Sequence, residues 1–215
     1  FNYYNFWFFP ERMQEYADRY LTFRDITPEE LNSFKQEFEK LVKISLWNTN
    51  GTQYLSKNPP HTGRVKALTE LFPDAKFVFL MRNPYTVFES TRNFFQNTIK
   101  PLELHSISLE QMEQNILRNY VELYKAYKEQ KTILDAGHLY EVRFEDIEAD
   151  ALGITQQIYQ QLNLPGWEEA RPAIEKYING KKGYKKNRYD YDPRTVQLVN
   201  EHWGDILDEW GHERL

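Results

Sequence analysis

Two positively charged residues follow two consecutive segments that are each predicted to form a short β-strand. The first segment, 52–56, precedes Lys57, and the second, 76–81, precedes Arg82. Between them, residues 62–72 carry apolar side chains at helical spacing, which predicts a helix. A strand, a helix and a strand within about thirty residues form a βαβ unit whose strands run parallel. Lys57 and Arg82 are therefore predicted to lie at the carboxyl ends of parallel strands, where open α/β sheets bind ligands.

The segment after Arg82 completes a predicted anion site. Asn83 is expected to cap a helix over 84–97, and Ser90 lies two turns into it, at the edge of the apolar stripe. The predicted stripe consists of Val87, Thr91, Phe94 and Phe95. A guanidinium, a hydroxyl and a helix N-terminus together can hold a phosphate. An arginine paired with a local carboxylate and a serine bonded within its own helix fit the same spacing.

The composition of the chain limits the class of protein to which it can belong. The chain has 215 residues, of which 40% are hydrophobic and 16% aromatic, which is typical of a globular protein. No apolar run approaches the roughly 18 residues of a membrane span. The absence of cysteine excludes disulfides, thiol catalysis and cysteine-bound zinc, and fits a cytoplasmic protein, with membrane association left open. The net charge of −5 argues against general nucleic-acid binding.

Capping signals place the other elements of a single predicted α/β domain over 1–215. Helices are predicted to begin at the Thr27-Pro28, Ser108 and Asp192-Pro193 signals. A third strand is predicted over 138–144, and further helices over 149–162 and 167–177. The predicted sheet therefore has at least three strands.

Several motifs are more specific than the periodicity. These are the Ser-Lys-Asn-Pro-Pro-His run at 56–61, Phe-Pro-Asp-Ala at 72–75, the Arg82 and Ser90 pair, Val-Arg-Phe-Glu-Asp at 142–146, Leu-Asn-Leu-Pro at 162–165 and Trp-Gly at 210–211. Over about residues 50–215 the sequence resembles sulfotransferases that depend on 3′-phosphoadenosine 5′-phosphosulfate (PAPS), in particular their large bacterial branch. The resemblance implies a P-loop-NTPase-like parallel sheet flanked by helices, with a helix-rich C-terminal half.

The resemblance also implies roles for matching residues. Arg82 and Ser90 would hold the 3′-phosphate of PAPS, and Lys57 would lie near the transferring sulfuryl group, with no metal ion taking part. The basic segment 181–188 resembles the one that closes over the 3′-phosphate, with Lys182 and Gly183 as its best candidates. A solvated basic loop is the alternative interpretation.

For two candidates, Phe144 and His61, the sequence supports a role in the site and a structural role about equally. Phe144 matches a position where an aromatic ring often packs near adenine, and a core role is the alternative. His61 lies at the start of the predicted helix, where the imidazole would be neutral and suited to a general base. It does not match the spacing of the catalytic histidine in the cytosolic branch, so an N-cap or surface role stays open. Glu89 and Glu145 are competing candidates for the base.

One family feature is missing from the sequence. The family has a Gly/Ser/Thr-rich turn near its N-terminus that binds the 5′-phosphosulfate, and the first glycine here is Gly51. The chain begins at Phe1, and seven of its first nine residues are aromatic. We therefore expect an N-terminally truncated domain that is inactive by itself. The aromatic start is interpreted as a core or cleft-lining segment, or else as an exposed carbohydrate platform.

The sequence thus predicts an enzyme that moves a sulfuryl group from PAPS to a hydroxyl or amine. The acceptor would be a carbohydrate, a lipid or another small molecule, and nucleic acid is not expected as a partner. A P-loop kinase-like phosphotransferase and a non-catalytic carbohydrate-binding protein are the alternatives. Neither the acceptor nor the oligomeric state can be predicted from these motifs.

Overall fold

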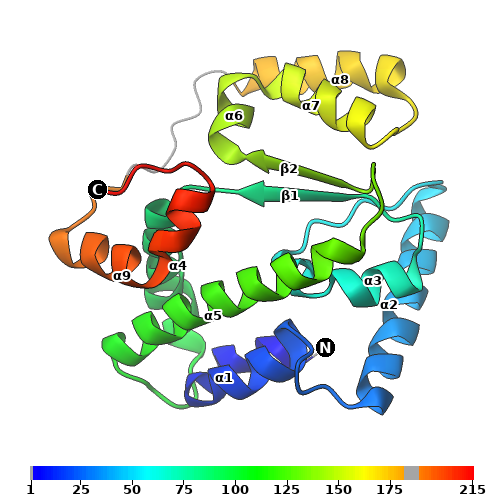
Figure 1. Ribbon diagram of the computed structural model, residues 1–215. Helices are drawn as coiled ribbons and strands as arrows, with labels where there is room; N and C mark the ends of the chain where they lie inside the picture. Colours follow the sequence, from blue (N-terminus) through cyan, green and yellow to red (C-terminus); the bar gives the residue numbers. More distant parts are fainter. Residues whose placement is uncertain (1, 182–188) are drawn as a thin grey trace. The chain divides into compact units, whose positions relative to one another are not determined.

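The computed structural model describes residues 2–181 and 189–215, which divide into two compact units (Figure 1). The first unit comprises residues up to Ala75 together with Asn93–Ile133, and the second comprises Lys76–Arg92 and Leu134–Leu215. The first unit contains η1 (Asn2–Trp7), η2 (Pro10–Arg12), α1 (Met13–Tyr16), η3 (Ala17–Leu21), α2 (Pro28–Thr49), η4 (Pro59–Gly63), α3 (Val65–Leu71), η5 (Phe95–Ile99), η6 (Lys100–Leu102), α5 (Leu109–Gln130) and η7 (Lys131–Ile133). The second unit contains β1 (Phe77–Met81), most of α4 (Pro84–Phe94), β2 (Leu139–Arg143), α6 (Phe144–Ala149), α7 (Ala151–Gln161), α8 (Trp167–Gly180) and α9 (Pro193–Glu209).

The long helices of the first unit begin where the sequence predicts. The Thr27 hydroxyl accepts a hydrogen bond from the backbone N–H of Glu30, whose carboxylate accepts one from the N–H of Thr27. Ser108 and Gln111 form the same reciprocal capping box at the start of α5. Each box satisfies two backbone donors that a helix start would otherwise leave unpaired.

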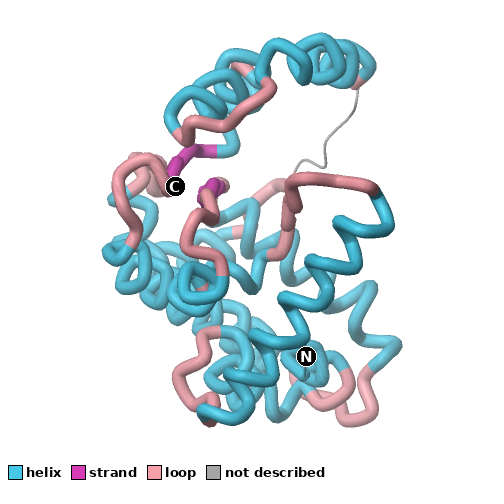
Figure 2. Tube along the Cα trace, turned by 90° about the vertical axis from the view of Figure 1, so that its right-hand side faces the viewer, coloured by secondary structure: helices cyan, strands magenta, loops and turns pink. Residues whose placement is uncertain are grey.

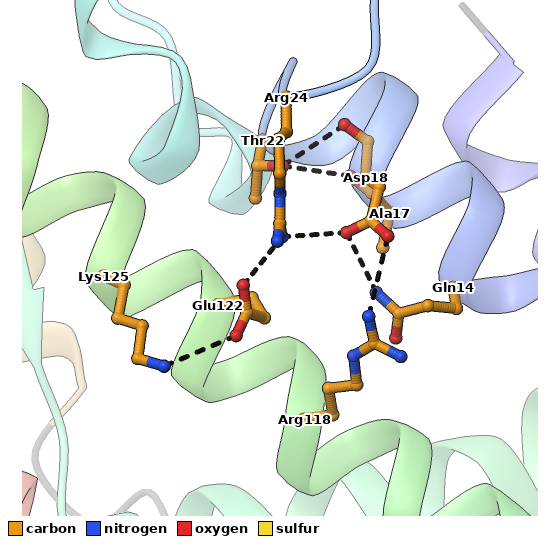
Figure 3. A network of polar contacts seen from close by, with 8 residues as sticks. All are labelled: Gln14, Ala17, Asp18, Thr22, Arg24, Arg118, Glu122 and Lys125. Carbon is orange, nitrogen blue, oxygen red and sulfur yellow. Dashed lines mark hydrogen bonds and ion pairs between the residues drawn. The ribbon is translucent and has the colours of Figure 1, made fainter.

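Polar contacts tie the two stretches of the first unit together (Figure 3). The Arg24 guanidinium lies 2.8 Å from Asp18 and 2.7 Å from Glu122 of α5. Arg118, also on α5, lies 3.6 Å from Asp18. Because exposed ion pairs contribute only about 0–1 kcal/mol each, we assign this network a role in fixing the direction of α5 rather than a large share of the stability.

The second unit contains the sheet of the described residues. β1 and β2 pair in parallel, with Phe77 opposite Leu139 and Met81 opposite Arg143 (Figure 1). Both strands agree with the predicted segments 76–81 and 138–144 to within one residue at each end. Figure 2 shows the two strands side by side. Within the described ranges, no helix is both long and apolar enough to cross a membrane.

The predicted strand over 52–56 is wrong. Residues 52–58 form an exposed loop that pairs with neither strand, so the described part of the chain has two strands rather than at least three. Lys57 therefore does not follow a strand. Only Tyr54 and Leu55 are strongly apolar in this segment, and Pro59 and Pro60 end it, so little in it favours a strand without a partner to supply backbone hydrogen bonds.

The buried face of α4 also differs from the predicted stripe. Tyr85, Phe88 and Glu89 are buried, whereas Val87 and Thr91 are only half-buried and Phe94 is exposed. Phe95 is buried as predicted, in the π-helical turn η5. The Phe88 ring packs edge-on against Trp203 of α9, with ring centroids 5.8 Å apart. Apolar residues lie on more than one side of α4, and the contact with α9 decides which side is buried.

Candidate functional site

The end of the sheet brings two of the predicted donor residues into contact. Arg82 follows β1 directly and Phe144 follows β2 directly, and the parallel register places the two positions side by side. The Arg82 guanidinium carbon lies 4.7 Å from the centroid of the Phe144 ring, a cation–π contact. Arg82 is half-buried and forms no ion pair with a carboxylate of the described residues. Its charge is therefore positioned by the ring, with no acidic partner in the part of the chain that the structure describes.

The turn after Arg82 is held by hydrogen bonds at both of its ends. The Asn83 side chain caps α4, since its Oδ1 accepts from the backbone N–H of Tyr85 (3.0 Å) and of Thr86 (3.3 Å). The backbone N–H of Asn83 donates to Glu145 Oε1 at 3.1 Å. The first-turn amides of α4 thus already have acceptors, and the part of this helix N-terminus in holding a phosphate stays a prediction.

Ser90 lies two turns into α4 and is half-buried. One turn earlier, on the same side of the helix, Thr86 Oγ1 lies 2.6 Å from the Tyr191 hydroxyl. The Tyr191 ring also packs against Tyr85, with centroids 5.5 Å apart. Tyr191 comes three positions after the basic segment, so the chain leaving that segment lies on the helix that carries Ser90. The candidates Lys182 and Gly183 fall outside the described residues.

Glu89 is bonded in a way that does not suit a general base. It is 8% exposed, and its Oε1 accepts a 2.6 Å hydrogen bond from the Thr195 hydroxyl of α9. Arg92 donates to both of its carboxylate oxygens, at 2.7 and 2.8 Å. A buried carboxylate with these partners has its charge compensated, and it ties α4 to α9.

Lys57 and His61 belong to the first unit, where both line a cavity of about 470 Å³. Lys57 lies on the exposed loop before η4 and forms no ion pair with any carboxylate among the described residues. His61 lies in η4 itself. Lys57 and Arg82 lie in different units, and their predicted convergence on one anion stays a prediction.

The surroundings of His61 favour a neutral imidazole. Its Nε2 lies 3.1 Å from the Ser56 hydroxyl, and its ring packs edge-on against Phe38 at a centroid distance of 5.2 Å. Its Nδ1 is buried and has no hydrogen-bond partner among the described residues. Burial, and next the positive charge of Arg64, lower the pKa of His61 to about 4. His61 is therefore uncharged at neutral pH, as a general base must be.

The backbone around η4 leaves little freedom to move His61. A Cβ added at Gly63 would lie 2.8 Å from the carbonyl oxygen of Leu21, so only glycine fits this approach. The Arg64 guanidinium donates to the Tyr20 carbonyl and lies over the ring of Phe23, at 4.8 Å. Both contacts fix η4 against η3 and hold the histidine in place.

Two site contacts could not be derived from the sequence pattern. These are the contact of Phe38 with the His61 ring and the contact of Tyr191 with Thr86. The signal for Phe38 is its i, i+4 spacing from Phe34 on the face that also carries Leu41. No comparable local signal exists for Tyr191, because its partner Thr86 is distant in the sequence.

Comparison with known proteins identifies the class. The chain matches the model of the sulfotransferase family over residues 7–169, and it therefore belongs to that family. It is 32% identical over 206 residues to the omega-hydroxy-beta-dihydromenaquinone-9 sulfotransferase Stf3 of Mycobacterium bovis and to that of Mycobacterium tuberculosis. The match covers 96% of this chain and 53% of each relative, so the chain spans about half the length of the curated relatives it matches. No solved structure matches the chain significantly.

Proposed function

We propose that the protein transfers a sulfuryl group from PAPS to a hydroxyl of a small-molecule or lipid acceptor. The observation that carries this proposal is the Arg82 guanidinium, which has no carboxylate partner among the described residues and is held on Phe144 at the carboxyl end of the sheet. Family membership supports sulfuryl transfer in general. A half-buried guanidinium with no acid beside it suits a phosphate, so the residues present fit the donor.

In this proposal the second unit binds the nucleotide end of the donor. Arg82 and Ser90 hold the 3′-phosphate, and Lys182 and Gly183 in the basic segment close over it. The contact between Tyr191 and Thr86 supports this assignment, because it leads the chain from the basic segment onto α4 near Ser90. Because the Arg82 guanidinium lies over the Phe144 ring, we assign Phe144 to positioning Arg82 rather than to packing on adenine.

In the same proposal His61 and Lys57 carry out the transfer step. His61 takes the proton of the acceptor hydroxyl, whose oxygen forms a bond to sulfur while the bond from sulfur to the donor phosphate breaks. The electron pair of that bond leaves with 3′,5′-ADP. Lys57 stabilises the negative charge that develops on the leaving oxygen. The acceptor hydroxyl would take the place of the Ser56 hydroxyl at His61 Nε2.

The acceptor is proposed to be lipid-like. The two relatives are named as sulfotransferases of a hydroxylated menaquinone derivative, and they match this chain over nearly all of its length. Sequence identity of 32% supports the same class of acceptor more than the same molecule.

The assignment of Arg82 can be tested by nucleotide binding. Arg82→Ala removes one charge-assisted contact, which is expected to cost about 1.5–3 kcal/mol, or about ten- to 150-fold in affinity for 3′,5′-ADP. Affinity for 5′-AMP, which lacks the 3′-phosphate, should change much less. Calorimetric titration of the full-length protein with both nucleotides measures the difference, and equal losses for the two would refute the assignment.

Phe144→Leu is the companion variant in the same titration. If the ring positions Arg82, its loss should weaken the binding of 3′,5′-ADP by about two- to fivefold, in line with a cation–π contact of about 0.5–1 kcal/mol, and leave that of 5′-AMP nearly unchanged. If the ring packed on adenine, Phe144→Leu would instead weaken the binding of both nucleotides equally.

A further inference from the structure

The cavity beside His61 has two chemically different walls. One wall is formed by Phe34, Phe38 and Leu41 of α2, which recur at i, i+4 and i+7 and so share one face of the helix. The other wall is the loop and turn from Ser56 to His61, which presents a hydroxyl, an ammonium group and an imidazole. A ligand that satisfies both walls has an apolar body and one polar end.

The apolar wall is built from ordered aromatic rings. Phe34 and Phe38 are stacked, with centroids 5.7 Å apart and ring planes at 8°. Phe38 also meets the Tyr54 ring edge-on at 6.4 Å, so the wall continues onto the loop. Leu41 is 50% exposed and lines the cavity one turn further along α2. These rings and the leucine give an apolar ligand a preformed surface.

The polarity of the two walls selects among ligands, because the charged lining residues that the structure describes, Lys57 and Arg64, are both basic and the α2 wall is apolar. None of its lining residues is acidic, and the sequence has no Asp or Glu between Glu39 and Glu70. A saccharide brings many hydroxyls, and each one placed on the phenylalanine wall would lose its water without gaining a partner. An alcohol with a single hydroxyl can place its hydrocarbon body on that wall without removing a hydroxyl from water. The volume of about 470 Å³ lies within the usual range of about 300–1,000 Å³ for small-molecule sites.

We propose that this cavity is the acceptor site, and that the acceptor is an alcohol with an apolar body and a single hydroxyl end. The body lies on Phe34, Phe38 and Leu41, and the hydroxyl points to His61 and Lys57. This inference rests on the proposed function, because the hydroxyl is an acceptor only if the protein transfers a sulfuryl group. The binding of the apolar body does not depend on PAPS. Leu41 is the specificity-determining position, since it lines the cavity but neither takes the proton nor stabilises the leaving oxygen.

The test uses a matched pair of variants on α2. Leu41 and Ile44 are both 50% exposed on the same helix, and only Leu41 lines the cavity. Leu41→Ser should weaken the binding of geraniol or 2-naphthol by about fivefold, as expected for the loss of a half-buried leucine contact, while Ile44→Ser should stay within about twofold of wild type. Calorimetry without donor gives both values, and matched thermal unfolding of the two variants checks that each is folded.

The outcomes separate this inference from the proposed function. Equal effects of Leu41→Ser and Ile44→Ser, or binding of cellobiose in place of both alcohols, would overturn the acceptor site. Weaker alcohol binding with Leu41→Ser but not with Ile44→Ser supports the site, even if the protein then fails to transfer sulfate from PAPS. Transfer of sulfate to an alcohol with no dependence on Leu41 would leave the proposed function standing and place the acceptor elsewhere.

Discussion

Replacing His61 by asparagine is expected to lower kcat by about 10²–10³-fold while leaving the affinity for 3′,5′-ADP nearly unchanged. General-base catalysis contributes typically about 10²–10⁴-fold. We expect the lower part of that range, because an imidazole with a pKa near 4 is fully available at neutral pH but has a small driving force for taking a proton. Asparagine keeps a polar side chain at this position. Steady-state kinetics of the full-length protein, together with nucleotide titration, measure both quantities.

His105→Asn is the matched control for this variant. His105 lies in the same unit, is exposed and is paired with Glu11 at 2.7 Å, and it is not among the described residues that line the cavity. Its replacement should leave kcat within about twofold of wild type. A His61→Asn protein that kept more than about a tenth of wild-type kcat would remove His61 from the chemistry.

The pH profile gives a second measure of the same histidine. The folded-state pKa lies below the usual 6.5, so the imidazole stays neutral as pH falls through 6.5 and is protonated only near pH 4. The plot of kcat/KM should therefore stay flat through pH 6.5 and fall only as pH approaches 4. The same shift implies that folding stability is full above about pH 6.5 and declines between 6.5 and 4, because there the unfolded chain binds the proton first. Circular dichroism at each pH separates the two effects.

Lys57→Ala is expected to lower kcat by about 10²–10³-fold, the loss seen when one preorganised donor to a developing charge is removed. The physical reason is that charge accumulates on the leaving oxygen only as the bond to sulfur breaks, so the ammonium group stabilises the transition state more than the bound donor. Lys57 is exposed and has no carboxylate partner among the described residues, so its removal should not disturb the fold.

Single-turnover kinetics distinguish this role from simple donor binding. With the donor saturating, the rate of the transfer step should drop while the affinity for 3′,5′-ADP changes by less than about threefold. If kcat were unchanged and only KM for the donor rose, Lys57 would belong to ground-state binding.

Local chemistry explains which elements could be predicted from the sequence. The starts of α2, α5 and α9 depend on Thr27, Ser108 and Asp192, whose side chains bond amides only three residues away. β1 is a short apolar segment, β2 mixes apolar with charged residues, and turns bound both, which is a pattern that favours strands. The strand over 52–56 could not be judged in this way, because a strand also needs a partner distant in the sequence.

The site shows the same division between local and distant information. Arg82 and Asn83 could be placed at a strand end and a helix cap from their own neighbourhood. The contact between Arg82 and Phe144 depends on the register of β1 with β2, which the sequence alone does not specify. The buried side of α4 depends in the same way on Trp203, more than a hundred residues further along the chain. The pKa of His61 depends on its burial in η4, which no spacing rule predicts.

The most direct test of sulfuryl transfer is a labelling experiment with the full-length protein. We expect ³⁵S-labelled PAPS, without added metal ion, to yield a labelled sulfate ester of an apolar alcohol and an equal amount of 3′,5′-ADP, with Arg82→Ala reducing product at subsaturating donor. A parallel reaction with γ-³²P-labelled ATP and magnesium should leave the acceptor unlabelled. Label carried from ATP to the acceptor, with none carried from PAPS, would show that the protein is a phosphotransferase and would contradict sulfuryl transfer.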